Sequence, residues 1–274
     1  MVTAVWGWTF VLVKGALQHY PTLPFLELRF ILALLVMVAI VRRLPAQREL
    51  RVGLIAGAVL AAGYWTQTVG LTMTSPANSG LITGLFVVFT PLIDSLFGAR
   101  LQWWTWVAVA AALTGTVMLV GGPSHFGVGD LLTVACAILY GLHIVLLSRW
   151  SPGLRSAPLA MVQMGAGALI FTGTGSWTFQ VPTPNVWLAI VVTGVFASAL
   201  AFYIQTWAQQ HLSASRTALI LTTEPAWALL AAVVLAGQRF GLLQAAGAAI
   251  VLTAIVGHEL AHLKFKPHGD QAPA

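Results

Sequence analysis

Long uninterrupted apolar runs dominate the chain and set its predicted architecture. A membrane-spanning helix needs about 20 mainly apolar residues to cross roughly 30 Å of hydrocarbon. Because these runs do not alternate with polar residues, they favour helices over the strands of a membrane barrel. We therefore expect an all-α integral membrane protein with ten transmembrane helices, at residues 1–17, 25–41, 52–72, 77–98, 103–121, 128–147, 158–176, 185–207, 215–236 and 241–262.

The composition excludes several classes of protein. Of 274 residues, 58% are hydrophobic and 7% are charged, and the mean hydropathy is +0.88. A soluble domain carries about 25% charged residues, so a soluble enzyme, a secreted disulfide scaffold and a disordered tail protein are excluded. Cys136 is the single cysteine, and the sequence contains no Walker motif, nucleophile elbow or His-Glu-x-x-His pattern. We expect no enzymatic activity, no cofactor and no metal site.

The basic residues are distributed unevenly between the two sets of alternating loops. The pI of about 10.1 could indicate a nucleic-acid partner, but cytoplasmic loops of membrane proteins are also enriched in Lys and Arg. One set of loops, with the tail, contains ten basic residues, whereas the other contains Arg239 only. The ten are Arg42, Arg43, Arg48, Arg51, Arg100, Arg149, Arg155, Arg216, Lys264 and Lys266. The pattern predicts a bacterial inner-membrane protein with both termini in the cytoplasm, in contact with lipid and not with nucleic acid; the oligomeric state is left open.

The two halves of the chain resemble each other weakly. Trp6-Gly7 matches Tyr140-Gly141 at an offset of 134, and further along Tyr64 matches Tyr203 at an offset of 139. We expect two five-helix repeats, at 1–122 and 123–263, followed by a polar cytoplasmic tail at 264–274. Because five is odd, the second repeat enters the membrane from the opposite side. Inverted repeats are common in secondary transporters, whose substrate site lies near the midplane between the halves.

Several segments together resemble one family of membrane proteins. They are Val5–Val11, Lys14, Pro24, Leu28–Phe30, Ser75–Leu81, Val88–Leu92, Ser213–Arg216, Glu224-Pro225 and Gly237–Arg239. In these segments the chain resembles the EamA-type members of the drug/metabolite transporter superfamily. The resemblance implies ten helices in two inverted repeats around a central cavity, and export of small metabolites or drugs. One departure is Gln238, where the family often has Glu.

Ionisable residues within or near the spans are candidates for coupling or gating, because each is costly to bury in a bilayer. Glu224 lies mid-span before Pro225, and Asp94 follows Pro91; we predict helix kinks at both prolines. Glu224 is either a proton or cation site or a hydrogen-bond acceptor that locks the kink, and Asp94 is more simply a packing carboxylate. Lys14 and Arg29 complete the set, with Lys14 expected to form a structural clamp or outer gate with Glu27.

Aromatic and amide side chains supply the predicted substrate site. Aromatic walls with a few polar groups suit a small amphipathic or cationic solute. Because Tyr64 and Tyr203 are repeat partners, we expect them on opposite walls of one cavity; the alternative is tight helix packing. His143 is either a packing residue or a group that contacts substrate. The predicted substrate-binding residues are Trp6, Tyr64, Trp65, Gln67, Tyr140, His143, Tyr203 and Gln205.

These patterns predict a secondary transporter that exports small metabolites by alternating access. Amino acids, aromatic or apolar ones above all, are the first expected substrate class, and amphipathic cationic drugs are the second. A nucleotide-sugar or sugar-phosphate exchanger of the same fold remains an alternative, although its phosphate would require cavity Lys or Arg groups. A non-transporting membrane protein is the other alternative.

Overall fold

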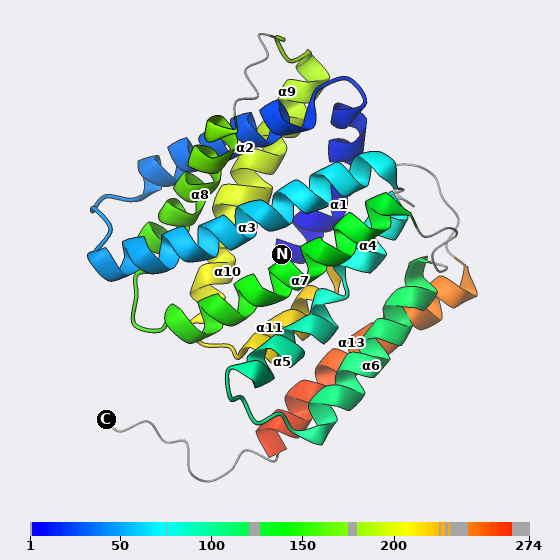
Figure 1. Ribbon diagram of the computed structural model, residues 1–274. Coiled ribbons are helices and arrows are strands. Elements are labelled where there is room, and N and C mark those ends of the chain that lie inside the picture. Colours follow the sequence, from blue (N-terminus) through cyan, green and yellow to red (C-terminus); the bar gives the residue numbers. More distant parts are fainter. Residues whose placement is uncertain are drawn as a thin grey trace.

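The computed structural model describes residues 2–74, 76–120, 127–174, 180–224, 226–227, 230 and 241–264, and every regular element within these ranges is a helix (Figure 1). The first half contains α1 (Val2–Leu17), α2 (Thr22–Ile40), α3 (Gln47–Met73), α4 (Pro76–Thr83), α5 (Phe86–Leu96) and α6 (Trp103–Val120). The second half contains α7 (Val128–Trp150), α8 (Ser156–Gly173), α9 (Pro184–Val191), the π-helical segment η1 (Val192–Leu200), α10 (Ala201–Gln209), α11 (Ala214–Leu221) and α13 (Leu242–Lys264).

Five helices are long and apolar enough to cross a bilayer: Thr22–Ile40, Gln47–Met73, Val128–Trp150, Ser156–Gly173 and Pro184–Gln209. Shorter apolar helices are found at Val2–Leu17, Phe86–Leu96, Trp103–Met118 and Leu242–His258. The predicted all-helical membrane architecture is therefore confirmed at this level. The span expected at 77–98 is two helices, because α4 ends at Thr83 and α5 begins at Phe86. Pro91 lies inside α5, so the break occurs well before the proline at which we expected a kink.

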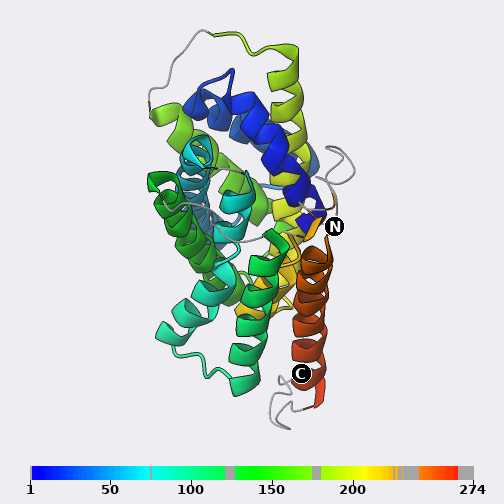
Figure 2. The same ribbon diagram turned by 90° about the vertical axis from the view of Figure 1, so that its right-hand side faces the viewer.

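The third span of each half packs against the first two spans of the other half. In the first half this span is α3, which lies against α7 and α8. In the second half it is the segment formed by α9, η1 and α10, which lies against α1 and α2. Helices α2 and α8 pack on each other, as do α6 and α13. The α6–α13 pair runs side by side along one edge of the molecule (Figures 1 and 2). Correspondence between the two sets of contacts agrees with a fold built from two related repeats.

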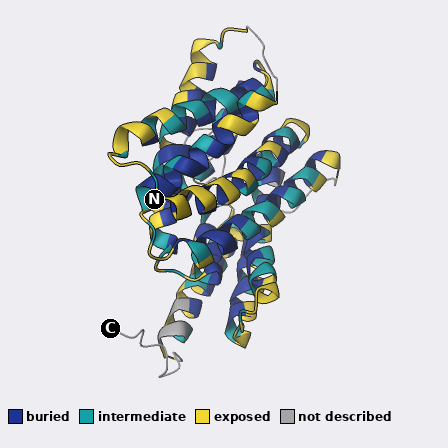
Figure 3. Cartoon of the chain, turned by 60° about the vertical axis from the view of Figure 1, so that its left-hand side comes forward, coloured by how far each residue is buried: buried dark blue, intermediate teal, exposed yellow. Residues whose placement is uncertain are grey.

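Two glycines allow the central helices to approach closely. A Cβ atom on Gly57 of α3 would lie 2.8 Å from the Gln163 carbonyl oxygen of α8, and one on Gly63 would lie 2.5 Å from the Tyr140 ring of α7. Small residues let membrane helices pack backbone to backbone. Buried residues accordingly gather on the inner faces of the helices, while the outer faces carry exposed ones (Figure 3). Many of the exposed side chains are large and apolar, as expected for a surface covered by lipid.

Candidate functional site

A cavity lies between helices of the two halves. It is lined by residues of α1, α2, α3 and α5 from the first half, and by residues of α7, α10, α11 and Glu224 from the second. About 680 Å³ between the lining side chains is free of protein atoms, including the part open to solvent. Among the sequence-predicted site residues, the structure brings together Trp6, Arg29, Tyr64, Gln67, Tyr140, His143, Gln205 and Glu224. The cavity thus combines aromatic walls with amide groups, an arginine and a glutamate.

Arg29 of α2 is buried at the wall of this cavity. Its Nε donates a hydrogen bond to Ser198 Oγ of η1 at 2.8 Å, and its Nη2 donates to the Tyr64 hydroxyl of α3 at 3.0 Å. The guanidinium carbon also lies 4.4 Å from the centroid of the Tyr64 ring, which is a cation–π distance. Arg29 therefore ties a helix of each half to the cavity wall.

Amide groups continue the polar lining. Gln67 accepts a hydrogen bond from the Tyr140 hydroxyl at 3.2 Å and donates to Thr83 Oγ1 at 3.2 Å. His143 Nε2 lies 2.8 Å from Gln163 Oε1. His143 therefore fits both interpretations of the sequence, since it packs in a helix interface through Gln163 and also lines the cavity.

The π-helical segment η1 decides which aromatic residue of α10 reaches the cavity. Phe202 lines it, with its ring centroid 6.0 Å from that of Tyr64, whereas Tyr203 is half-buried and is not among the lining residues. A π-helix makes i→i+5 hydrogen bonds, so residues after it face a different direction from those of a continuous α-helix. The same segment accepts a hydrogen bond from Trp6 Nε1, 2.8 Å from the Ala197 carbonyl oxygen.

Four other predicted residues lie away from the cavity or outside the described part. Trp65 is 47% exposed on the outer face of α3. Lys14 donates to the carbonyl oxygens of Leu71, Thr72 and Thr74 at the end of α3, so the expected clamp with Glu27 is wrong; a cation at a helix C-terminus is favoured by the helix dipole. Asp94 forms an ion pair with Arg149 at 2.7 Å, a contact that is compatible with packing and with gating. Pro225 lies outside the described residues.

Several lining residues were not predicted from the sequence. They are mainly apolar or small, and include Thr9, Phe10, Val13, Thr68, Phe86 and Phe202. Thr9, Phe10 and Val13 follow Trp6 at spacings of three, four and seven, which is one face of a helix. Extending that face from Trp6 would have found them. Phe202 gave no such signal, because its position depends on η1.

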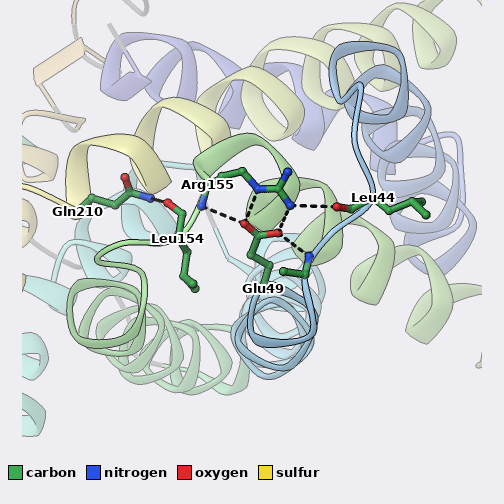
Figure 4. Close-up of polar contacts among 6 residues, drawn as sticks. Leu44, Glu49, Leu154, Arg155 and Gln210 are labelled. Atoms are coloured by element: carbon green, nitrogen blue, oxygen red, sulfur yellow. Dashed lines mark hydrogen bonds and ion pairs between the residues drawn. The ribbon is translucent and has the colours of Figure 1, made fainter.

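A buried carboxylate joins the two halves away from the cavity (Figure 4). Glu49 near the start of α3 is 2% exposed and accepts hydrogen bonds from Nε and Nη2 of Arg155 at 2.8 and 2.7 Å, from the Arg155 amide at 3.1 Å and from the Ala46 amide at 2.7 Å. Arg155, which precedes α8, also donates to the Leu44 carbonyl. The hydrogen bond to Glu49 raises the pKa of the Arg155 guanidinium.

Among the described residues, no group of three or more His, Cys, Asp or Glu side chains could hold a metal ion. The polar groups of the cavity are instead mostly neutral side chains, several of them on α3 and α7, together with Arg29 and Glu224. Such a set can bind and orient a small solute through hydrogen bonds, charge and aromatic contact.

Comparison with known proteins identifies the family. The model of the EamA-like transporter family matches the chain twice, at residues 1–121 and 127–258. The chain belongs to the EamA-like transporter family. The resemblance seen in the sequence is thereby confirmed, and the two matches place one family unit in each half of this EamA-like transporter.

Relatives and a solved structure agree with this assignment. An archaeal protein from Archaeoglobus fulgidus, named "Uncharacterized transporter", is 30% identical over 267 residues, covering 93% of this chain and 82% of its own. The inner membrane transporter YedA of Escherichia coli K12 is 22% identical, covering 92% and 86%. A Salmonella typhimurium protein named "Probable amino-acid metabolite efflux pump" is 25% identical, covering 93% and 91%. A crystal structure with a TM-score of 0.77 and 20% identity covers 97% of this chain and 96% of its own; it shares the fold.

Proposed function

We propose that this EamA-like transporter is a secondary active exporter of small metabolites, with aromatic or apolar amino acids as its first substrate class and amphipathic cationic drugs as its second. The observation that carries the proposal is the cavity, whose aromatic and amide walls come from both halves. Alternating access of two inverted repeats around this cavity would carry the solute across the bilayer. The Salmonella typhimurium relative named as an amino-acid metabolite efflux pump supports the same class.

The charges in the cavity favour an amino acid over a sugar phosphate. A phosphate group carries up to two negative charges and is commonly held by several Arg or Lys groups. Lys14 donates to three backbone carbonyl oxygens and is not among the lining residues. Among the described lining residues, Arg29 is then the one Lys or Arg, which leaves part of a dianion's charge without a partner. The nucleotide-sugar alternative therefore has weaker support than the amino-acid proposal.

The proposal includes a topology. We infer that both termini lie in the cytoplasm of a bacterial cell, because ten basic residues fall on one side of the predicted spans. The proposal has repeats at 1–122 and 123–263 and a cytoplasmic tail at 264–274. The relative YedA is named an inner membrane transporter, which supports the inner membrane as the location.

Flux measurements in proteoliposomes test the function. Purified protein, reconstituted and preloaded with unlabelled phenylalanine, is expected to take up labelled phenylalanine faster than empty liposomes, with competition by other apolar amino acids and weaker competition by cationic dyes. UDP-glucose is expected not to compete. Exchange of UDP-glucose without exchange of any amino acid would overturn the proposal in favour of the nucleotide-sugar alternative.

Coupling to protons is the next part of the proposal, with Glu224 as the coupling group. We expect a pH gradient to accelerate phenylalanine flux by the wild-type protein and to have no effect on the Glu224→Gln variant, because glutamine cannot release a proton. Exchange without a gradient should continue in that variant. The matched control is Glu27→Gln on α2, outside the cavity lining, which should keep the wild-type response. A pH response that survives in Glu224→Gln would contradict this role.

A further inference from the structure

We propose that Arg29 binds an anionic group of the transported solute and that this group is a carboxylate. The inference rests on the proposed function, because it names the feature by which the same cavity selects its substrate. Arg29 is 4% exposed and lines the cavity. It lies on α2 within a span long and apolar enough to cross a membrane.

The hydrogen bonds of Arg29 leave part of its guanidinium for a ligand. A guanidinium has five N–H donors, of which Ser198 and Tyr64 accept two. Both of these partners are uncharged, and among the described residues the ion pairs are Arg149–Asp94 and Arg155–Glu49. Arg29 thus keeps a charge and three donors that no carboxylate in the described part of the chain meets.

A charge held in this way needs a reason, because an arginine within a membrane span is costly unless it is paired or functional. A ligand carboxylate would supply the missing negative charge and could accept two parallel N–H bonds, the geometry in which arginine binds carboxylates most strongly. Ser198 and Tyr64 act as positioning residues, since each holds one edge of the guanidinium from a different helix.

The number of cations in the cavity distinguishes a carboxylate from a phosphate. Among the described lining residues, Arg29 is the one Lys or Arg and Glu224 is the one Asp or Glu. A carboxylate carries one negative charge, which the single guanidinium of Arg29 balances. A phosphate dianion would keep one of its two charges without a partner. The cavity therefore favours a solute with one carboxylate.

Competition assays with phenylalanine analogues test the role of Arg29. In wild-type proteoliposomes, phenethylamine, which lacks the carboxylate, should need at least about tenfold more than phenylalanine to halve the exchange of labelled phenylalanine, since a charge-assisted bond is worth about 1.4 kcal/mol or more. In the Arg29→Gln variant the two half-inhibitory concentrations should become equal. A preference for phenylalanine that persists in Arg29→Gln would overturn the proposal, as would its absence from the wild type. Phenyl phosphate competing better than 3-phenylpropionate would assign a phosphate site instead.

Further variants and a binding readout keep the test decisive. If Arg29→Gln does not fold, Arg29→Lys and Ser198→Ala should each raise the half-inhibitory concentration of phenylalanine more than that of phenethylamine; equal changes would overturn the proposal.

Thermal stabilisation of the purified protein by 3-phenylpropionate separates the Arg29 site from the proposed transport function. If the wild type exchanges no amino acid but is stabilised by this carboxylate, and Arg29→Lys is not, the proposed function fails and the Arg29 site stands. If neither carboxylate nor amine distinguishes the variants while phenylalanine is exchanged, the Arg29 site fails and the function stands.

Discussion

Replacing Tyr64 by alanine is expected to lower the rate of phenylalanine exchange at least about tenfold. Tyr64 lines the cavity, contacts the rings of Phe30, Tyr140 and Phe202, and accepts a hydrogen bond from Arg29. The variant loses an aromatic wall of the cavity and the hydroxyl that holds the Arg29 guanidinium. A hydrogen bond to a charged group is worth about 1.5–3 kcal/mol, while a tenfold loss of rate needs only about 1.4 kcal/mol.

The neighbouring residue provides the control. Trp65 is larger than Tyr64 but lies on the outer face of α3, so Trp65→Ala should retain most of the exchange rate. Tyr64→Phe, which keeps the ring and removes the bond to Arg29, should fall between the two. Each variant is compared at equal amounts of protein that elutes as a single peak in size-exclusion chromatography. Equal rates for Tyr64→Ala and Trp65→Ala would show that the cavity wall does not contribute to transport.

Breaking the Glu49–Arg155 contact is expected to produce the largest loss of stability. In Arg155→Gln, the Glu49 carboxylate would stay buried with the two backbone amides as its donors, and removing one partner of a buried charge is strongly destabilising. We expect the apparent melting temperature of the purified protein to fall by about 5 °C or more. Because Glu49 and Arg155 join α3 to the α7–α8 connection, the halves should separate more easily.

A second ion pair is the matched control for this prediction. Arg149 pairs with Asp94 at the same distance of 2.7 Å. Both arginines are partly exposed, but the Asp94 side chain is 13% exposed and that of Glu49 is 3% exposed, and ion pairs nearer the surface contribute less. Arg149→Gln should therefore lower the melting temperature much less than Arg155→Gln. The double variant Glu49→Gln/Arg155→Gln should be more stable than the sum of its single changes predicts. Strict additivity, or equal effects of Arg149→Gln and Arg155→Gln, would contradict the importance of the buried contact.

The sequence predicts the helices well because their signal is local. The apolar runs at 25–41 and 128–147 correspond closely to α2 (Thr22–Ile40) and α7 (Val128–Trp150). Lipid on the outer faces removes the need for a polar face, so continuous apolar composition is enough to mark a span. The family resemblance could be read for the same reason, since its short segments are contiguous in the chain.

Contacts between distant residues could not be read in this way. The expected pair of Lys14 and Glu27 rests on their positions toward the outer ends of the first two predicted spans, but the acceptors of Lys14 are carbonyl oxygens at the end of α3. Every residue has a backbone carbonyl oxygen, so the sequence does not show which of them accepts a hydrogen bond from a lysine. Glu49 and Arg155 are 106 residues apart, and Arg155 was counted only as a marker of the cytoplasmic side.

The candidate site was predicted where residue type alone is informative. Ionisable residues such as Arg29 and Glu224 and mid-span polar groups such as Gln67 are unusual in apolar helices, and all three line the cavity. The choice between Phe202 and Tyr203 was not accessible, because it depends on the hydrogen-bond register of η1. A π-helical segment is set by packing, so the period of the sequence does not reveal it.

Labelling of two valines on α1 shows whether solute passes through the cavity. Val13 lines it, whereas Val11, two residues earlier, is 54% exposed on the outer face. In a Cys136→Ala background, a charged methanethiosulfonate reagent should slow phenylalanine exchange in Val13→Cys relative to its own unlabelled rate, and saturating phenylalanine should protect. The Val11→Cys rate should not change. Labelled Val13→Cys protein that exchanges phenylalanine at its unlabelled rate would contradict transport through this cavity.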